Sequence, residues 1–204
     1  MLYLSTDVLE PDTPNYGKIV HETLISLCQA TQGRTLILFT SKSQLRRTYE
    51  AISKPLEQSG ILVLGQYVDG SRRQLLDNFR TMPRSVLLGT RSFWEGVDVS
   101  GDALSVLVIT RLPFAVPSDP IIAARSETFT DAFNEYMVPQ AILAFRQGFG
   151  RLIRTASDRG VVVMLDKRVL TKNYGKSFIG ALPKCTEVRG LCKELPRKAE
   201  EWLR

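Results

Sequence analysis

The chain is 204 residues long, with 27 basic and 21 acidic residues and a formal net charge of +6. This length suits one domain with its own apolar core, and the charge favours a polyanionic partner without choosing between nucleic acid and an anionic membrane surface. Three cysteines without a CxxC pair and a single histidine argue against a zinc site, and no apolar run approaches the roughly 20 residues that cross a bilayer, so we expect a cytoplasmic protein without a membrane partner.

Short apolar runs alternate with longer helical patterns along the chain. The runs are nearly continuous, which is typical of parallel strands covered on both faces. The predicted strands are Thr35–Thr40, Ile61–Leu64, Ser85–Gly89, Leu104–Thr110 and Val161–Leu165. The predicted helices are Gly17–Gln32, Ser41–Gln58, Ser71–Thr81, Pro120–Glu135 and Pro139–Thr155. These repeated βα units predict an α/β fold, a three-layer sandwich with a mainly parallel central sheet.

Prolines and composition suggest how the chain is divided. Residues 1–15 are predicted to be a segment that enters from a preceding region missing from this sequence, and residues 16–204 to be the domain. Pro55 is expected to end or kink its helix early, and the tail from Lys184 to contain a final short strand and helix. The longest interruption, Arg111–Asp119, directly follows a strand, where open α/β sheets bind ligands.

The segment QGFGRLIR near the end of the last long helix contains the densest group of polar side chains. On a continuous helix, Gln147, Arg151 and Arg154 would share one face. Gly148 and Gly150 each cost about 1 kcal/mol there relative to alanine, unless another group must approach the backbone closely. Such a face could bind phosphate oxygens. From spacing alone, an arginine-rich surface helix paired to carboxylates explains the segment equally well.

Four segments together resemble a known family. QGFGRLIR resembles motif VI of superfamily 2 helicases, and GTRSFWEGVD (89–98) resembles motif V in its DinG and XPD form. TLILFTSKS (35–43) resembles motif IV, and RLPFAVPSDP (111–120) is similar to the loop that these helicases carry between motifs V and VI. Because the four occur in the right order, the chain resembles the second, C-terminal RecA-like motor domain of a DinG/XPD-like DNA helicase. The resemblance also implies movement from 5′ to 3′ on DNA.

The resemblance implies a nucleotide cleft shared with a preceding motor domain of the same polypeptide. Motif V would line it with Glu95, Gly96 and Asp98, and motif VI would contribute Gly150. The glycines let backbone amides approach an anion closely. The alternative makes Glu95 and Asp98 ordinary turn residues.

Motif VI implies catalytic roles. Arg151 and Arg154 would be arginine fingers, with Gln147 orienting the γ-phosphate of ATP. ATP and Mg²⁺ would be bound mainly by the missing first domain, because this chain has no GxxxxGK[ST] loop directly after a strand and no DEAD or DEAH sequence. The GKS at 175–177 is interpreted as a chance match in a loop. The isolated fragment is therefore expected to be inactive.

Motifs IV and V also imply contacts with single-stranded DNA. Ser41 and Lys42 begin a helix, where free N–H groups suit a phosphate, although simple capping by Ser41 explains the serine too. Thr90, Arg91 and Ser92 would face the DNA backbone.

Aromatic side chains near these motifs are candidates for stacking on bases. The candidates are Phe93 and Trp94 in motif V and Phe114 in the proline-rich loop. An aromatic residue in an α/β domain, however, more often packs in the core.

Two other functions remain open. A catalytically silent α/β module that binds nucleic acid would explain the basic charge and the missing phosphate loop. A nucleotide-binding enzyme with its ligand at the Gly89–Asp98 loop is less favoured, because no nucleophile or base accompanies that loop. Relatives of this family often hold an iron–sulfur cluster on four cysteines of the first domain. Cys28, Cys185 and Cys192 do not match that pattern, so no cluster is expected in this fragment.

Overall fold

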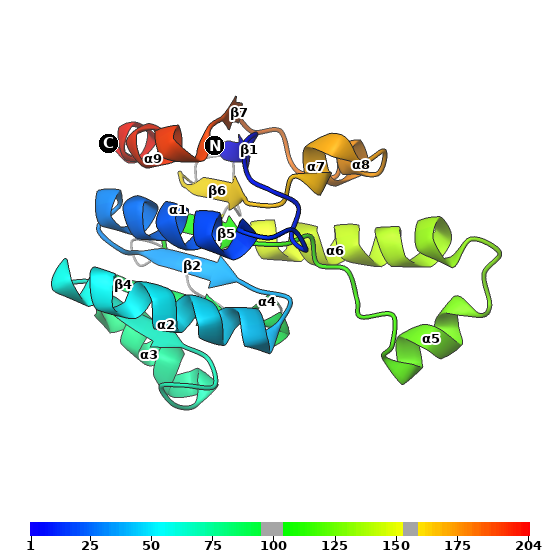
Figure 1. Cartoon of the computed structure of the whole chain (residues 1–204), viewed down its shortest axis with the longest axis horizontal. Coiled ribbons are helices and arrows are strands. Elements are labelled where there is room, and N and C mark those ends of the chain that lie inside the picture. Colours follow the sequence, from blue (N-terminus) through cyan, green and yellow to red (C-terminus); the bar gives the residue numbers. More distant parts are fainter. Residues whose placement is uncertain (95–103, 153–158) are drawn as a thin grey trace.

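The protein is organised around one parallel sheet (Figure 1). The structure is a computed structural model that describes residues 1–94, 104–152 and 159–204. The strands are β1 (Leu2–Ser5), β2 (Thr35–Leu38), β3 (Leu62–Gly65), β4 (Ser85–Gly89), β5 (Val106–Ile109), β6 (Val161–Met164) and β7 (Glu187–Gly190). They pair in the order β3-β4-β2-β5-β6-β1-β7, and every pairing is parallel.

Helices cover both faces of the sheet. The longer ones are α1 (Tyr16–Ala30), α2 (Lys42–Gln58), α3 (Arg72–Thr81), α6 (Val138–Phe149) and α9 (Leu195–Leu203). The shorter ones are α4 (Arg91–Trp94), α5 (Pro120–Ser126), the π-helix η2 (Phe133–Met137), α7 (Arg168–Thr171), α8 (Gly175–Gly180) and the 3-10 helix η3 (Cys192–Glu194). Figure 1 shows α5 set apart from the sheet, below the end of α6 that extends away from it.

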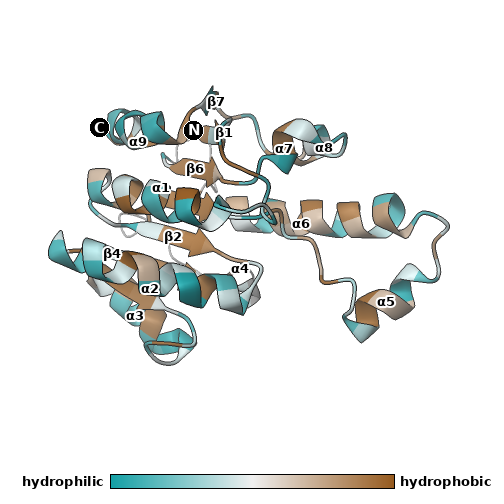
Figure 2. Cartoon of the chain, viewed as in Figure 1, coloured by the Kyte–Doolittle hydropathy of each residue, from teal (hydrophilic) through white to brown (hydrophobic). Residues whose placement is uncertain are grey.

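Alternating strand residues form two separate apolar cores. Ile37 packs with residues of α1, α2 and α9, whereas its neighbours Leu36 and Leu38 pack with residues of α3, α4, α6 and α8. Figure 2 shows the same pattern, with apolar strands at the centre and polar residues on the outer helical surfaces. A sheet whose residues are buried on both faces requires nearly continuous apolar strands. The predicted three-layer α/β sandwich with a parallel sheet is therefore confirmed.

Local sequence fixes several helix starts. Ser71 and Gln74 form a reciprocal capping box at α3, and the side chain of Ser41 accepts a hydrogen bond from the amide of Gln44 at α2. Both arrangements satisfy amides that lack partners within the helix.

The first strand corrects one expectation. Residues 1–15 were predicted to be a segment that leads into the domain, yet Leu2–Ser5 form β1 inside the sheet, between β6 and β7. The run of Leu2, Tyr3 and Leu4 is fully apolar and buried, as an internal parallel strand requires. The predicted strand and helix after Lys184 correspond to β7 and α9.

Three helix predictions also need correction. Pro55 lies inside α2, which continues to Gln58 instead of ending early. The predicted helix Pro120–Glu135 is α5 followed, after a break, by the π-helix η2, because α5 ends at Ser126. The helix predicted to reach Thr155 ends at Phe149. The GKS triplet opens the short helix α8, whereas a loop was expected.

In the parts of the chain that the structure describes, no helix is long and apolar enough to span a membrane. In the same parts, no group of three or more His, Cys, Asp or Glu side chains is arranged to hold a metal ion. Cys28 and Cys192 are buried thiols, and Cys185 is an exposed one.

Candidate nucleic-acid and nucleotide interface

The carboxyl ends of neighbouring strands bring distant segments to one edge of the sheet. Gln66 follows β3, Thr90 follows β4, Ser41 lies shortly after β2, and Arg111 lies shortly after β5. Because these four strands are adjacent in the sheet, their following residues lie in that same order along the edge. This is the edge at which open α/β sheets bind ligands.

A hydrogen-bond network joins the ends of β3 and β4. The Oε1 atom of Gln66 accepts from the backbone amide of Thr90 at 2.7 Å and from its hydroxyl at 3.0 Å. Nε2 of Gln66 donates to Oγ of Ser92 at 2.8 Å, and the hydroxyl of Tyr67 bonds Oγ1 of Thr90 at 2.9 Å. The Nζ atom of Lys42 lies 4.7 Å from the centre of the Tyr67 ring. The network therefore connects residues predicted from motifs IV and V.

Gln66 and Tyr67 were missed by sequence reasoning. Tyr67 has a left-handed backbone conformation, with φ 71°, and remains 41% exposed. A bulky residue in this region is uncommon and is often found at functional sites. Their position directly after a predicted strand was the available signal.

Ser41 does two things at the start of α2. It caps the helix through the Gln44 amide at 3.4 Å, and its Oγ lies 2.8 Å from that of Ser43. Capping and a phosphate contact both remain compatible with this partly exposed hydroxyl. The backbone of Arg91 begins α4.

The end of α6 differs from the predicted motif VI geometry. Because α6 ends at Phe149 with Gly150 as its cap, Arg151 lies in the following turn and does not share a continuous helical face with Gln147. Gln147 is exposed, and Nε of Arg151 donates to the backbone carbonyl of Trp94 at 3.2 Å. This bond joins motif VI to the α4 segment of motif V. The other predicted members, Arg154, Glu95, Gly96 and Asp98, lie outside the described residues.

Gly148 is required by packing against an indole ring. A Cβ atom at this position would lie 2.8 Å from Cε3 and 2.9 Å from Cζ3 of Trp94. Trp94 is 3% exposed and donates from Nε1 to the carbonyl of Phe39 at 3.3 Å, and Phe93 is fully buried. Phe93 and Trp94 therefore pack in the core and are not displayed for base stacking.

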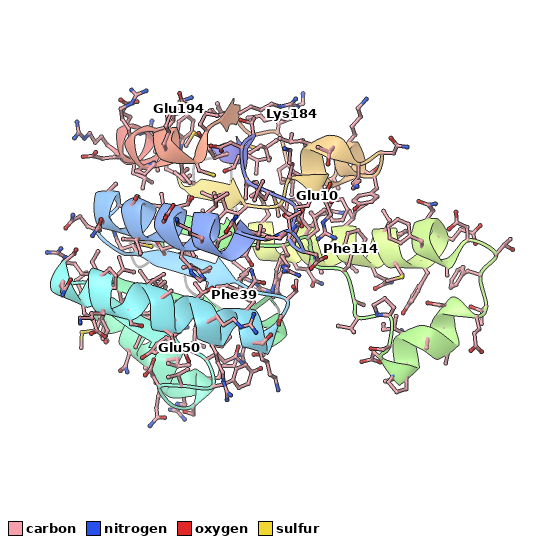
Figure 3. The ribbon with its side chains drawn as sticks, viewed as in Figure 1. Glu10, Phe39, Glu50, Phe114, Lys184 and Glu194 are labelled. Carbon is pink, nitrogen blue, oxygen red and sulfur yellow. The ribbon has the colours of Figure 1, made fainter. Side chains whose placement is uncertain are left out.

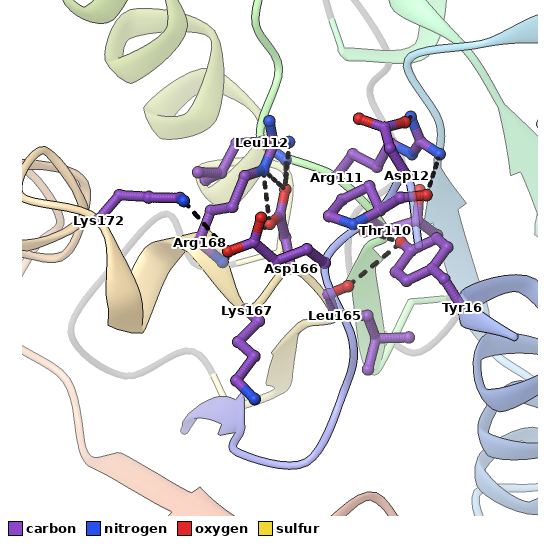
Figure 4. Close-up of polar contacts among 12 residues, drawn as sticks. Asp12, Tyr16, Thr110, Arg111, Leu112, Leu165, Asp166, Lys167, Arg168 and Lys172 are labelled. Carbon is purple, nitrogen blue, oxygen red and sulfur yellow. Dashed lines mark hydrogen bonds and ion pairs between the residues drawn. The ribbon is translucent and has the colours of Figure 1, made fainter. Parts of the chain in front are cut away.

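The proline-rich loop after β5 is held by a buried carboxylate. Asp166, which is fully buried, accepts from the amide of Leu112 at 2.8 Å and forms an ion pair with Arg168 at 2.6 Å (Figure 4). Burial opposes the charge of Arg168, but its hydrogen bond with Asp166 raises the pKa of the guanidinium above its ordinary value. The loop therefore leaves the sheet in a defined direction.

Aromatic packing places the rest of this loop against α8. Phe114, labelled in Figure 3, is partly buried and lies 5.6 Å from the ring of Phe133, 5.4 Å from Tyr174 and 5.8 Å from Phe178. Phe114 therefore anchors the loop. A cavity of about 360 Å³ lies beside it, and Gln147 is among its lining residues.

A model of the helicase C-terminal domain matches residues 24–185 of the chain. The chain belongs to the helicase C-terminal domain family. More specifically, it is a C-terminal domain of the DinG/XPD-like kind, as the following similarities show.

Two curated relatives are similar to this helicase C-terminal domain. It is 42% identical over 176 residues to the ATP-dependent DNA helicase YoaA of Haemophilus influenzae, covering 84% of the chain and 27% of the relative. It is 40% identical over 162 residues to the protein named 3′-5′ exonuclease DinG of Bacillus subtilis, covering 77% of the chain and 17% of the relative. The chain thus spans less than a third of either protein.

Solved structures share the RecA-like α/β fold of this helicase C-terminal domain. One described as an XPD helicase gives a TM-score of 0.68 at 24% identity, covering 93% of this chain and 35% of that one. Another, S. cerevisiae Dbp5 bound to RNA and ADP BeF3, gives 0.61 at 18% identity, covering 100% of this chain and 45% of that one.

Proposed function

We propose that this helicase C-terminal domain is the second motor domain of an ATP-dependent DNA helicase. It grips single-stranded DNA along the carboxyl edge of its sheet and presents motif VI arginines to ATP that a preceding domain holds. The observation that best supports the grip is the network in which Gln66 and Tyr67 join Lys42 to Thr90 and Ser92. These residues come from three separate segments and include an exposed ring beside an ammonium group.

The polar groups of this edge suit a nucleic-acid backbone. Lys42 supplies a positive charge, and Ser41 and Ser92 supply hydroxyl groups at neighbouring strand ends. Phosphate contacts of this kind provide affinity without base sequence specificity. The exposed ring of Tyr67 offers a stacking surface, worth about 1–3 kcal/mol per base in single-strand sites.

Residues of motif VI would act on the nucleotide side. ATP with Mg²⁺, bound mainly by the preceding domain, supplies the phosphoryl group whose transfer spreads negative charge over its oxygens. Arg151 and Arg154 would stabilise that charge, an effect of about 10³–10⁵ in rate, and Gln147 would orient the γ-phosphate. The exposure of Gln147 and the bond that holds Arg151 against Trp94 support this role. Glu95, Gly96, Asp98 and Gly150 would complete the cleft.

The two sites would be coupled through motif V. Thr90 and Ser92 lie at the proposed DNA edge, and Trp94, two residues beyond Ser92, is bonded to Arg151. Closure of the cleft around ATP would therefore move the DNA-binding edge of this domain relative to the DNA-binding surface of the preceding domain. This movement would couple ATP hydrolysis to stepping along the DNA.

The first test compares ATP hydrolysis, with and without single-stranded DNA, by this chain and by a parent protein that includes the preceding domain. We expect the chain alone to be inactive and the parent to be stimulated by DNA. In the parent, Arg151→Ala or Arg154→Ala should abolish hydrolysis but leave nucleotide binding intact. Normal turnover in both variants would contradict the finger assignment.

The same comparison distinguishes a helicase motor from a module that binds nucleic acid without catalysis. A parent that binds DNA without hydrolysing ATP would indicate a catalytically silent nucleic-acid-binding module. Ser41→Ala combined with Lys42→Ala should weaken DNA binding and flatten its dependence on salt, because phosphate contacts release counterions. An unchanged salt slope would remove this segment from the DNA path.

A further inference from the structure

A second cavity, separate from the one beside Phe114, opens on the same edge of the sheet at the first residue of the proline-rich loop. It has a volume of about 330 Å³ and lies between the starts of α1 and α2 and the residues that follow β5. Its polar lining consists mainly of Thr13, His21, Ser43, Gln44, Arg47 and Arg111. Ser41 also lines it, so the cavity adjoins the proposed DNA grip.

Two residues that line the cavity each have a buried polar atom without a hydrogen-bond partner among the described residues. Nε of Arg111 and Oε1 of Gln44 are both buried atoms without a partner there. The two terminal nitrogens of Arg111 are already engaged, with Asp12 at 3.2 Å and with the carbonyl of Pro11 at 2.7 Å, and Figure 4 shows Arg111 beside Tyr16. Leaving such atoms unpaired is costly, so the geometry favours a bound polar group.

The charge of the lining favours an anion. Asp12 offsets Arg111, but Arg47 is exposed and has no ion pair or hydrogen bond with any described residue. His21 adds no charge near pH 7, because burial lowers the pKa of its ring. The amide of Gln44 can turn to present either its oxygen or its nitrogen. An oxygen-rich anion could therefore accept from Arg111, Gln44 and Arg47 together.

The position of the cavity continues the row of strand ends. Gln66, Thr90, Ser41 and Arg111 follow four adjacent strands in the order β3-β4-β2-β5. Neighbouring strands are about 4.8 Å apart, so three steps cover about 14 Å. A single nucleic-acid strand crossing these ends would pass from the Tyr67 network over Ser41 to Arg111.

We propose that the Arg47–Arg111 cavity is a further subsite for the nucleic-acid backbone, taking a phosphodiester group of the single strand beyond motifs IV and V. This subsite rests on the proposed grip on single-stranded DNA.

The test uses a matched pair of charge substitutions on α2. Arg46 and Arg47 are adjacent and both exposed, but only Arg47 lines the cavity. Binding of a labelled oligothymidylate to the whole chain is measured by fluorescence anisotropy at several salt concentrations. Arg47→Gln should weaken binding roughly five- to tenfold and reduce the log–log salt slope by about 0.7, the value for one phosphate on a single strand. Arg46→Gln should change affinity less than about twofold if only general charge is lost.

Asp12→Asn tests whether Arg111 has only a structural role, as the partner of Asp12 in an ion pair. Removing this carboxylate should strengthen oligothymidylate binding, because it no longer competes for Arg111. Equal effects of Arg47→Gln and Arg46→Gln, or weaker binding by Asp12→Asn, would overturn the subsite.

Three further outcomes show which proposal has failed. Suppose that the chain binds the oligonucleotide, that Ser41→Ala with Lys42→Ala weakens this binding, and that Arg47→Gln and Arg46→Gln have equal effects on it. The subsite is then wrong, and the proposed DNA contact at Ser41 and Lys42 stands. If inorganic phosphate raises the melting temperature and Arg47→Gln alone abolishes that rise, with equal DNA affinities, the cavity binds a free anion and the subsite is wrong. If the chain shows no oligonucleotide binding, the grip and the subsite fail together.

Discussion

Replacing Asp166 by alanine should destabilise the protein through the proline-rich loop. The carboxylate is fully buried and accepts hydrogen bonds from the amides of Leu112 and Arg168, besides its ion pair with the Arg168 guanidinium. Alanine would leave the buried Leu112 amide unpaired, at a cost of about 1–3 kcal/mol. Losing the ion pair adds about 1–2 kcal/mol, a discounted figure because the Arg168 side chain is 23% exposed.

The expected total loss is about 3 kcal/mol in the free energy of unfolding. For a chain of this size each kcal/mol lowers the melting temperature by about 2–4 °C, so Asp166→Ala should lower it by roughly 6–12 °C. Thermal unfolding followed by circular dichroism measures the shift. Asp166→Asn retains an oxygen that can accept from Leu112 and should lose about half as much. Equal melting temperatures for the alanine variant and the unmodified chain would refute this account of how the loop is held.

Three further predictions concern packing, the polar network and pH. Gly148→Ala should lower the free energy of unfolding by about 1 kcal/mol, because overpacking against Trp94, at about 1–3 kcal/mol, outweighs the gain in helix propensity of about 1 kcal/mol. The control Gly150→Ala should not destabilise, because its Cβ would meet nothing closer than 3.4 Å. Equal melting temperatures for the two variants would contradict the contact between residue 148 and Trp94. Gln66→Ala should leave a buried amide after β4 unpaired, cost about 1–3 kcal/mol and weaken DNA binding, as urea unfolding and anisotropy would show. Burial lowers the pKa of His21, so the unfolded chain binds more protons and stability should fall as the pH drops below about 6.5; this part of the pH dependence should disappear in His21→Gln.

The sheet was largely predictable because its strands are buried on both faces. Ser85–Gly89 was predicted with the bounds that β4 has, and the other four predicted strands differ from the observed ones only at their ends. β1 was missed because prolines shortly after it suggested an irregular segment, and four residues give too little periodicity to reveal a strand. The early end expected at Pro55 is not seen, because α2 continues past the proline to Gln58 with Leu56 buried.

The residues of the candidate site could be predicted where they belong to a recognisable motif. Positions that depend on tertiary packing could not be predicted as well. Lys42, Thr90 and Ser92 were predicted from motifs and meet in one network. A helical wheel could not show that α6 ends before Arg151, or that Trp94 explains Gly148. The roles of Gln147, Arg151 and Arg154 remain predictions for the ATPase experiments.

The place of β1 between β6 and β7 has a consequence for the order of folding. Leu2 pairs with Val162 on one side and Glu187 on the other, so β7 meets the rest of the described sheet only through β1. Both pairings close very large loops, and contacts of such sequence separation slow folding. The residues of β1 therefore cannot pair with both neighbours until nearly the whole domain that follows them is available. We expect amide exchange during refolding to show protection of β2, β4 and β5 before β1 and β7, so that the two ends of the chain become ordered together.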